Sequence, residues 1–463
     1  MNRLVMMRVP STTPLSFLTR RGRALGGWLV ILGVLLNEWV LRNFSYDGVF
    51  TIHTRLSIWT FDVSAVALGL MWRAAGIRAI PAADSLRHKR MSSLFVGCLV
   101  SAGVTVGLIA CAEGVSGWLN YRASLKAEKD EDEYHSLVNR HDSILGYRLL
   151  PGRTARVAAK VKGRVVVNAV YTLDGAGRRL TPGHPSRDAA GTLLFFGDSF
   201  TFGEWVNDDD TMPFTITQLT PQYQVYNYGV PGYGPQHILA KLEGDAILSE
   251  VDAVPPVIGV YAFIDAHVDR AIGSMHHYAS WMADCPYYDF NASGTGVVRK
   301  GSFRTGRPWR SALYGFFGRS QILRYFNVNW PIRPSKRDVD LTCRIIEASR
   351  DRFQALFGSD RFYVLFYPGS SFGETMIPQL EARGVRTLDY SQLVDYWRGT
   401  RYQLPGCDNH PTALTHRLVA VQLVHDLNLM GSDENKQFVS KPSDDPSHRL
   451  PQFQVATPAS GGE

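Results

Sequence analysis

The sequence predicts an α/β fold, a parallel sheet between two layers of helices, preceded by membrane-crossing helices. Two observations lead to this prediction. From Gly191 to Leu427, short apolar runs alternate with stretches of helical periodicity, which is the pattern of βα units. The first 114 residues instead hold three apolar stretches with basic residues between them, as multi-pass membrane proteins do.

A chain of 463 residues is too long for one ordinary domain. Its 45% hydrophobic and 20% charged residues are typical of a folded protein. We divide it into a membrane region with about three transmembrane helices (1–114), a charged stalk with a small β-rich lead-in (115–190), the α/β domain (191–430) with an insertion (274–334), and a tail expected to be disordered (431–463).

The predicted membrane spans are Ala24–Leu41, Leu56–Trp72 and Leu94–Ala112. Arginines precede the first span, and Arg and Lys lie between the second and third, so the positive-inside rule puts both segments in the cytoplasm. An odd number of crossings then places the α/β domain on the outer side of the membrane. A signal peptide is the alternative, but no small-x-small cleavage site follows. Glu38 and Asp62 are either intramembrane acids or marks of a span boundary, and we favour the boundary.

The segment between membrane and α/β domain has two patterns. The highly charged residues of Tyr121–Asp142 predict a solvated helical stalk. After Ile144, short β-type runs and turn residues predict a small β-rich unit that packs against the next domain.

The α/β domain is predicted to begin with a buried strand that ends in Gly-Asp-Ser. The expected strands are Leu193–Phe196, Gln224–Tyr228, Pro256–Tyr261, Arg361–Tyr367 and Arg386–Leu388. The expected helices are Thr211–Leu219, Gln236–Leu248, Arg337–Phe357 and Pro411–Leu427.

Ser199 is the candidate nucleophile because it follows a parallel strand, where α/β folds place their sites. A turn with a capping serine is the alternative. His410 in Asp408-Asn409-His410-Pro411 is the candidate base, and Asp408 is close enough in sequence to orient its imidazole. A surface turn before a helix-starting proline would have the same residues.

Backbone N–H groups for an oxyanion hole are expected in the loop that contains Gly229 and Gly232, which is also consistent with an ordinary turn. The third strand is followed by Asp265 and His267. Both are candidate substrate-binding or oxyanion residues, and a helix cap by Asp265 is the alternative.

These blocks resemble the SGNH (GDSL-like) hydrolase superfamily over about Gly191–Leu427, and the lead-in is similar to that of its membrane-anchored bacterial branch. The resemblance implies a three-layer, flavodoxin-like fold. It implies Ser199 as nucleophile and oxyanion donor, Gly232 as second donor, and Asp408 and His410 as acid and base. The Asp-x-His spacing resembles polysaccharide O-acetyltransferases. The third block departs from the family, because Ile264 stands where an asparagine would donate a hydrogen bond; His267 is a possible substitute.

The resemblance implies an ester hydrolase or acetyl transferase acting on an envelope or secreted polysaccharide, and a transferase would need a membrane partner that supplies the acyl donor. An SGNH-fold glycan-binding or assembly protein that has lost catalysis is the main alternative, and a lipid-directed esterase is the third. The aromatic, arginine-rich insertion suits either a sugar-binding lid or a packed subdomain.

No cofactor, metal or nucleic-acid partner is expected from the sequence. The five cysteines have no metal-ligand spacing, and a disulfide among Cys285, Cys343 and Cys407 is left open.

Overall fold

The computed structural model describes residues 26–45, 50–77, 107–122, 127–129 and 136–429, apart from residues 32, 35–36, 51, 108, 162–163, 183–188, 245 and 405. The predicted tail 431–463 and the basic segment before residue 24 lie outside the described residues.

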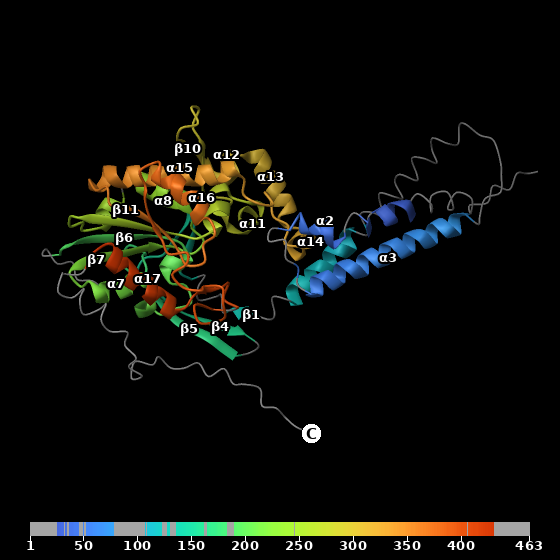
Figure 1. The fold of residues 1–463 in the computed structure, drawn as a ribbon, viewed down its shortest axis with the longest axis horizontal. Helices are drawn as coiled ribbons and strands as arrows, with labels where there is room; N and C mark the ends of the chain where they lie inside the picture. The colour runs from blue at the N-terminus through green and yellow to red at the C-terminus, as the bar shows by residue number, and fades with distance from the viewer. Residues whose placement is uncertain are drawn as a thin grey trace, which may run out of the picture.

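A five-stranded parallel sheet forms the centre of the α/β domain (Figure 1). Its strands are β6 (Gly191–Gly197), β7 (Tyr223–Gly229), β8 (Val257–Phe263), β11 (Phe362–Phe366) and β12 (Arg386–Asp389). They lie in the order β12-β11-β8-β6-β7, with Phe196 of β6 opposite both Tyr228 and Tyr261. This is the flavodoxin-like order, in which the chain reverses direction across the sheet next to the first strand. The predicted α/β class is therefore confirmed.

Helices cover both faces of the sheet, because alternate side chains of the buried strands point to opposite sides. Leu194 and Phe196 pack in one core with α8, α15 and α16. Leu193 and Phe195 pack in another with α7 and α17, and Figure 1 shows these two helix layers above and below the sheet. The helices of the two layers are α7 (Met212–Leu219), α8 (Pro235–Glu243), α15 (Lys336–Phe357), α16 (Gly373–Glu381) and α17 (Ala413–Asp426).

The predicted strands and helices of this domain lie within a few residues of those in the structure. One helix predicted over Gln236–Leu248 is instead two, α8 and α9 (Ile247–Glu250), separated by Gly244. Helix α16 was not predicted, since Pro378 inside it is a helix breaker by propensity. The remaining short elements are α6 (Ser199–Phe202), η1 (Asp208–Asp210), α10 (Ala266–Ile272), β13 (Gln403–Leu404) and β14 (His410–Pro411).

The lead-in forms two small antiparallel sheets, β1-β4-β5 and β2-β3. Their strands are β1 (Ala127–Lys129), β2 (Val138–Asp142), β3 (Gly146–Leu149), β4 (Thr154–Val161) and β5 (Arg164–Thr172). The prediction of a helical stalk over Tyr121–Asp142 is wrong beyond residue 122 among the described residues, because β1 and β2 are strands. Pairing of β1 with β4 satisfies its backbone groups, and this tertiary contact outweighs the helical preference of Ala, Glu and Lys.

Helix α3 (Ile52–Ile77) contains the whole of the second predicted span, Leu56–Trp72, whereas the first predicted span is divided between two short helices. The described N-terminal helices comprise residues 26–34 with gaps, α2 (Glu38–Arg42), α3 and residues 109–122. Among the described residues, no helix has both the length and the apolar character needed to cross a membrane. Most of the predicted span Leu94–Ala112 lies outside them.

The first predicted span, Ala24–Leu41, contains a helix start, since Asn37 caps α2 with an extended backbone. The Glu38 carboxylate then accepts from Arg55 at 2.7 Å and from the Trp59 indole at 2.9 Å, which ties α2 to α3. Helix 26–34 packs on α3 through glycines, because a Cβ at Gly69 would lie 2.6 Å from the carbonyl of Gly26.

The insertion is a packed subdomain with its own core around Met282, Phe303 and Tyr314. It comprises α11 (Met275–His277), η2 (Tyr278–Met282), the hairpin β9 (Pro286–Phe290) and β10 (Val297–Ser302), α12 (Phe303–Gly306), α13 (Pro308–Phe317) and α14 (Gln321–Tyr325). The sequence left open whether the insertion is a sugar-binding lid or a packed subdomain, and the structure shows a packed subdomain. The subdomain also supplies Trp281 to a cavity in the α/β domain.

Cys285, Cys343 and Cys407 are buried, and no disulfide joins any two of them, which answers the question that the sequence left open.

Candidate active site

A cavity of about 390 Å³ lies at the carboxyl ends of the parallel strands. Residues after β6, β7, β8 and β11 and the loop before α17 all line it, which is where open α/β sheets bind ligands. Five of the seven predicted site residues meet there, whereas Gly229 and His267 do not line it. The cavity is lined by Ser199, Gly232, Asp265, Asp408 and His410, together with the substituted position Ile264.

Ser199 is the first residue of α6, directly after β6. Its side chain is 5% exposed and lines the cavity. Asp198 caps the helix by accepting from the Phe200 N–H at 3.0 Å. Because the cap fixes the turn, Ser199 is held at the sheet edge, where it lines the cavity.

Asp198 is fully buried and pairs with Arg270 at 2.6 Å, while Nε2 of His267 lies 3.5 Å away. Burial opposes ionisation of Asp198, but His267 and Arg270 outweigh it and hold its pKa well below the usual range. Arg270 also donates to the Tyr233 carbonyl at 2.8 Å. The Asp198 carboxylate therefore joins the nucleophile turn to α10 and to the end of the glycine loop.

His267 lies behind the site, not in the cavity wall. It is fully buried, and its Nδ1 is 2.7 Å from the Tyr261 hydroxyl and 3.3 Å from the Ile264 N–H. Burial lowers the pKa of His267 and the Asp198 carboxylate opposes this shift, and the ring links α10 to β8 and to the nucleophile turn. This position gives no support to the expectation that His267 replaces the missing asparagine donor.

His410 is 7% exposed and has a defined tautomer. Its Nδ1 lies 2.7 Å from the Cys407 carbonyl oxygen. Since a carbonyl can only accept, Nδ1 carries the proton and Nε2 holds the lone pair of the neutral ring. The Phe200 ring, next to Ser199 in sequence, is 5.2 Å from the His410 ring, and the candidate base and the candidate nucleophile line the same cavity.

Glu204 is the residue that faces Nε2 of His410, at 3.3 Å. The contact has ion-pair distance, and Nε2 has no hydrogen-bond partner among the described residues. Burial lowers the pKa of His410, but the Glu204 carboxylate and the Cys407 carbonyl outweigh it and raise the pKa above its ordinary value. Glu204 thus stabilises the imidazolium that forms when the base takes a proton.

Asp408 and Asn409 have left-handed backbone conformations, with φ of 49° and 56°. Such conformations are tolerated best by Asn and Asp among residues with side chains. The turn they make brings the Cys407 carbonyl to His410. Asp408 is exposed and lines the cavity, and its role as orienter of His410 stays a prediction.

Two positions, one at the end of β7 and one in the loop after it, have no room for a side chain, so they require glycine. A Cβ at Gly229 would collide with the Phe202 N–H, so Gly229 lets β7 approach α6. Gly232 has φ of 83°, and a Cβ there would lie 2.6 Å from the Tyr147 hydroxyl and 3.0 Å from Nε1 of Trp281. Tyr147 of the lead-in donates to the Pro231 carbonyl at 2.7 Å. The β-rich lead-in therefore fixes the loop that carries the candidate oxyanion donor.

The end of the third strand, β8, is tied to the loop after β11. Asp265 accepts from the hydroxyls of Ser370 at 2.7 Å and Ser371 at 2.6 Å. Ile264 lines the cavity and packs against the core shared with α17. The structure thus places an apolar side chain at this part of the wall.

The sequence did not identify Glu204 or Trp397 as residues of the site, although both line the cavity. Trp281 and Trp397 are 41% and 62% exposed and line the cavity from the insertion and from the loop after β12. An acid five residues after a nucleophile is a weak signal, since helices and turns often carry one. No local pattern connects Trp397 to Ser199, because the fold alone brings them together.

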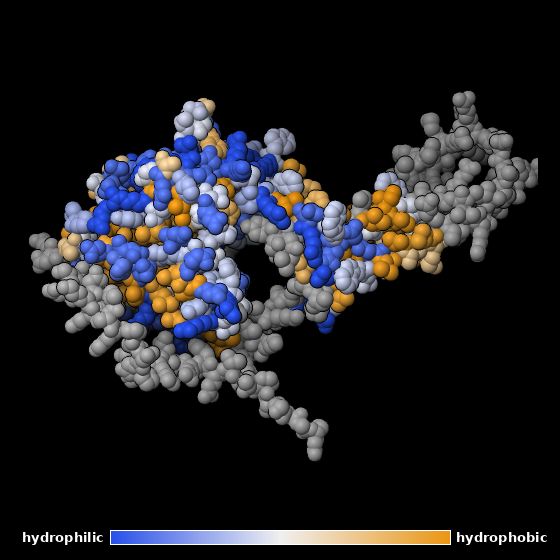
Figure 2. Space-filling model, in the orientation of Figure 1, coloured by the Kyte–Doolittle hydropathy of each residue, from blue (hydrophilic) through white to orange (hydrophobic). Residues whose placement is uncertain are grey.

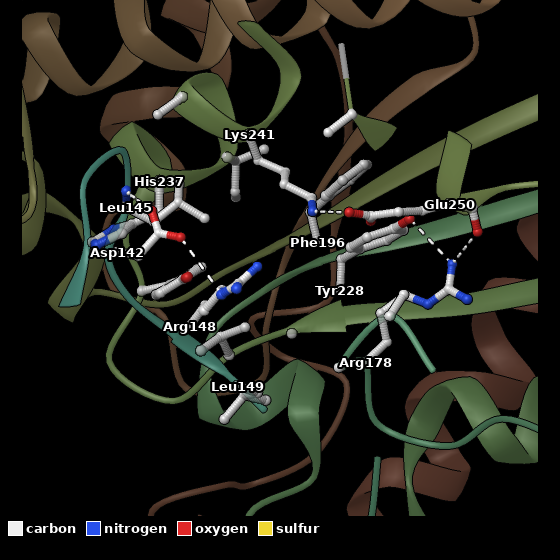
Figure 3. A pocket seen from close by; sticks show the side chains of 18 of the residues that line it. Asp142, Leu145, Arg148, Leu149, Arg178, Phe196, Tyr228, His237, Lys241 and Glu250 are labelled. Carbon is white, nitrogen blue, oxygen red and sulfur yellow. Dashed lines mark hydrogen bonds and ion pairs between the residues drawn. The ribbon is translucent and has the colours of Figure 1, made fainter. Parts of the chain in front are cut away.

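A second cavity of about 240 Å³ lies between the lead-in and α8 (Figure 3). Its charges are already paired, with Lys241 2.7 Å from Glu250 and Arg178 2.7 Å from Asp174. The cavity is therefore a polar seam between two packed units. Among the described residues, no group of three His, Cys, Asp or Glu side chains has the arrangement of a metal site.

No protein-family model matches the chain, and no curated protein matches it by sequence. Solved structures similar to it include a member of the lipolytic protein G-D-S-L family from Veillonella parvula (12% identity, 52% of this chain and 99% of that chain, TM-score 0.30). Another is an α/β hydrolase from the Lake Arreo metagenome (11% identity, 53% of this chain and 98% of that chain, TM-score 0.30). A third is an acetyl xylan esterase from Butyrivibrio proteoclasticus (10% identity, 66% of this chain and 100% of that chain, TM-score 0.31). Similarity at this level assigns no activity to this chain.

Proposed function

We propose that this chain is a serine-dependent ester hydrolase or acyl transferase of SGNH type. The observation that supports this most is one cavity lined by Ser199, His410 and Gly232 at the carboxyl edge of a parallel sheet. Acyl transfer through serine needs a nucleophile, a base and backbone donors in one place.

In the proposed mechanism, Ser199 Oγ attacks the ester carbonyl and Nε2 of His410 takes the hydroxyl proton. The N–H groups of Ser199 and Gly232 stabilise the tetrahedral oxyanion. Collapse of this intermediate breaks the ester C–O bond, and His410 returns the proton to the leaving alcohol. Water, or an acceptor hydroxyl in a transferase, then attacks the acyl-Ser199 and gives its own proton to His410. Collapse of this second intermediate breaks the acyl–Oγ bond, and His410 returns the proton to Ser199.

The substrate we propose is an acetylated envelope or secreted polysaccharide. Exposed Trp281 and Trp397 on two sides of the cavity offer flat faces against which sugar rings pack. We further propose a multi-pass inner-membrane anchor with this domain in the periplasm, and a membrane partner that supplies acyl groups if the chain is a transferase. A glycan-binding protein without catalysis is the second candidate, favoured by Ile264 in the cavity wall.

The test is labelling of the full-length protein in detergent with a fluorophosphonate probe, together with hydrolysis of p-nitrophenyl acetate. We expect both in the native chain and neither in Ser199→Ala or His410→Ala. Ser249→Ala is the matched control, because Ser249 is exposed on α9 away from the cavity. A folded native chain that neither labels nor hydrolyses would favour the glycan-binding candidate.

A further inference from the structure

Helix α13 of the insertion turns its apolar side outward. Ser311, Tyr314 and the following Gly318 are buried against the insertion core. Trp309, Leu313, Phe316 and Phe317, at spacings of a helical face, are 86%, 58%, 75% and 47% exposed. A surface helix normally has the opposite arrangement. A contiguous exposed patch of this kind marks an interaction site.

The segment of the chain that contains this face is strongly basic. From Asn291 to Ser335 the chain contains eight Arg and Lys residues and no Asp or Glu. Arg310, Arg319 and Arg324 of this stretch are exposed beside the apolar face of α13. Aromatic and aliphatic side chains with a rim of arginines are the composition of helices that lie in the interface of anionic bilayers.

The face adjoins the N-terminal helices. The Glu113 carboxylate accepts from the Gln321 N–H at 2.6 Å, and Asn120 donates to the Gln321 carbonyl at 3.0 Å. Ser57 of α3 lies 3.0 Å from the Tyr325 hydroxyl. Helix α14, directly after α13, is therefore the docking point of helix 109–122 and α3, and Figure 1 shows them side by side. Figure 2 shows hydrophobic residues on those helices and at the neighbouring end of the globular part.

We propose that the outward face of α13 lies in the interface of an anionic lipid bilayer. Trp309, Leu313, Phe316 and Phe317 enter the headgroup and acyl boundary, and the arginines contact lipid phosphates. Since α13 packs on η2 through Tyr278 and Tyr314, whose rings are 6.2 Å apart, the same contact holds the Trp281 side of the cavity near the membrane. The inference rests on the membrane association in the proposed function, and it is independent of the proposed ester chemistry.

The test measures the surroundings of residue 313 in the full chain. Leu313→Cys is labelled with an environment-sensitive fluorophore after Cys98→Ser and Cys111→Ser, because Cys285, Cys343 and Cys407 are fully buried. The protein is reconstituted into phosphatidylcholine vesicles with or without phosphatidylglycerol. Asp209→Cys, an exposed position in η1, is the matched control. Quenching by lipid-borne nitroxide is compared with quenching by iodide in the water phase.

We expect lipid nitroxide to quench the label at 313 at least about twofold more than the label at 209, with the reverse order for iodide. Phosphatidylglycerol should strengthen the lipid quenching, and Arg310→Glu with Arg319→Glu should weaken it. Iodide quenching as strong at 313 as at 209 would mean an open, water-facing helix and would overturn the proposal. Protection from both quenchers would also overturn it, because a second copy or another segment of this chain would then cover α13. None of these readouts requires catalytic activity.

Discussion

A different oxygen lies beside each ring nitrogen of His410, and the two oxygens determine which protonation state of the ring is favoured. The Cys407 carbonyl at 2.7 Å fixes the proton on Nδ1, and Glu204 at 3.3 Å favours a proton on Nε2. A general base must be neutral before the reaction, so the rate should fall below the raised pKa of His410.

We predict that Glu204→Gln lowers the pKa of His410, because it removes the carboxylate that favours the imidazolium. The acid limb of kcat/KM against pH should then move to lower pH, and kcat at neutral pH should fall by about tenfold since the imidazolium is less stabilised. Asp408→Asn is the comparison variant. If Asp408 is the orienter and Glu204 is not, Asp408→Asn will move the limb and Glu204→Gln will leave it in place.

Ile264 leaves one wall of the cavity without a hydrogen-bond donor. Ile264→Asn supplies a side-chain amide there, and we predict that it raises kcat for p-nitrophenyl acetate by about tenfold or more, because one oxyanion donor is typically worth about 10²–10³ in rate. Ile264→Leu, which fills the same space without a donor, should leave kcat nearly unchanged. Equal rates for the two variants would show that the amide does not reach the oxyanion.

At the scale of elements, the lead-in holds the loop that carries Glu204. Arg179 is fully buried and pairs with Asp208 at 2.6 Å, and it donates to the carbonyls of Gly203 at 3.2 Å and Val206 at 2.9 Å. Its guanidinium also lies 4.2 Å from the centre of the Tyr171 ring. One side chain thus joins β5, η1 and the turn after α6.

We predict that Arg179→Met lowers the free energy of unfolding by about 3–5 kcal/mol, because it removes the cation paired with Asp208 and leaves several backbone carbonyls without their donor. Urea unfolding followed by circular dichroism measures this change. Arg156→Met, at an exposed position of β4, should change it by less than about 0.5 kcal/mol. Similar effects of the two substitutions would mean that the Arg179 contacts contribute nothing beyond those of an exposed arginine.

At the scale of the whole molecule, the insertion connects the N-terminal helices to the α/β domain. Glu113 is the polar centre of this contact, since its carboxylate binds the backbone N–H of Gln321 and the hydroxyl of Ser320 at the start of α14. An acid at the first turn of a helix satisfies N–H groups that have no partner within the helix.

Glu113→Ala should therefore loosen α14 without unfolding the α/β domain, whose two main cores contain no residue before Leu193. We expect amide hydrogen exchange over residues 318–326 to speed up by about fivefold or more, equivalent to about 1 kcal/mol, while exchange of the central strands stays constant. Arg122→Ala, which removes only a stack on Trp118, is the control. Equal exchange in both variants would show that Glu113 does not hold the two parts together.

The sequence by itself determined the α/β architecture and the position of the candidate nucleophile. The short apolar runs before Gly197 and around Val260 predict buried strands, and both are central strands of the sheet. Gly-Asp-Ser stands at the end of the first run. These features depend on local periodicity and turn chemistry, which short stretches of sequence contain.

Tertiary structure alone decided the partners of those residues. The contact of His410 with Glu204 joins positions about two hundred apart in the chain, and the tautomer depends on a backbone carbonyl whose direction follows from two left-handed residues. The strand Ala127–Lys129 forms because β4 offers it hydrogen bonds. The outward apolar face of α13 has the same helical spacing as a buried one, and only the packing of Ser311 and Tyr314 shows which side meets the core. Periodicity gives the spacing of a face, whereas the neighbours that cover it come from the fold.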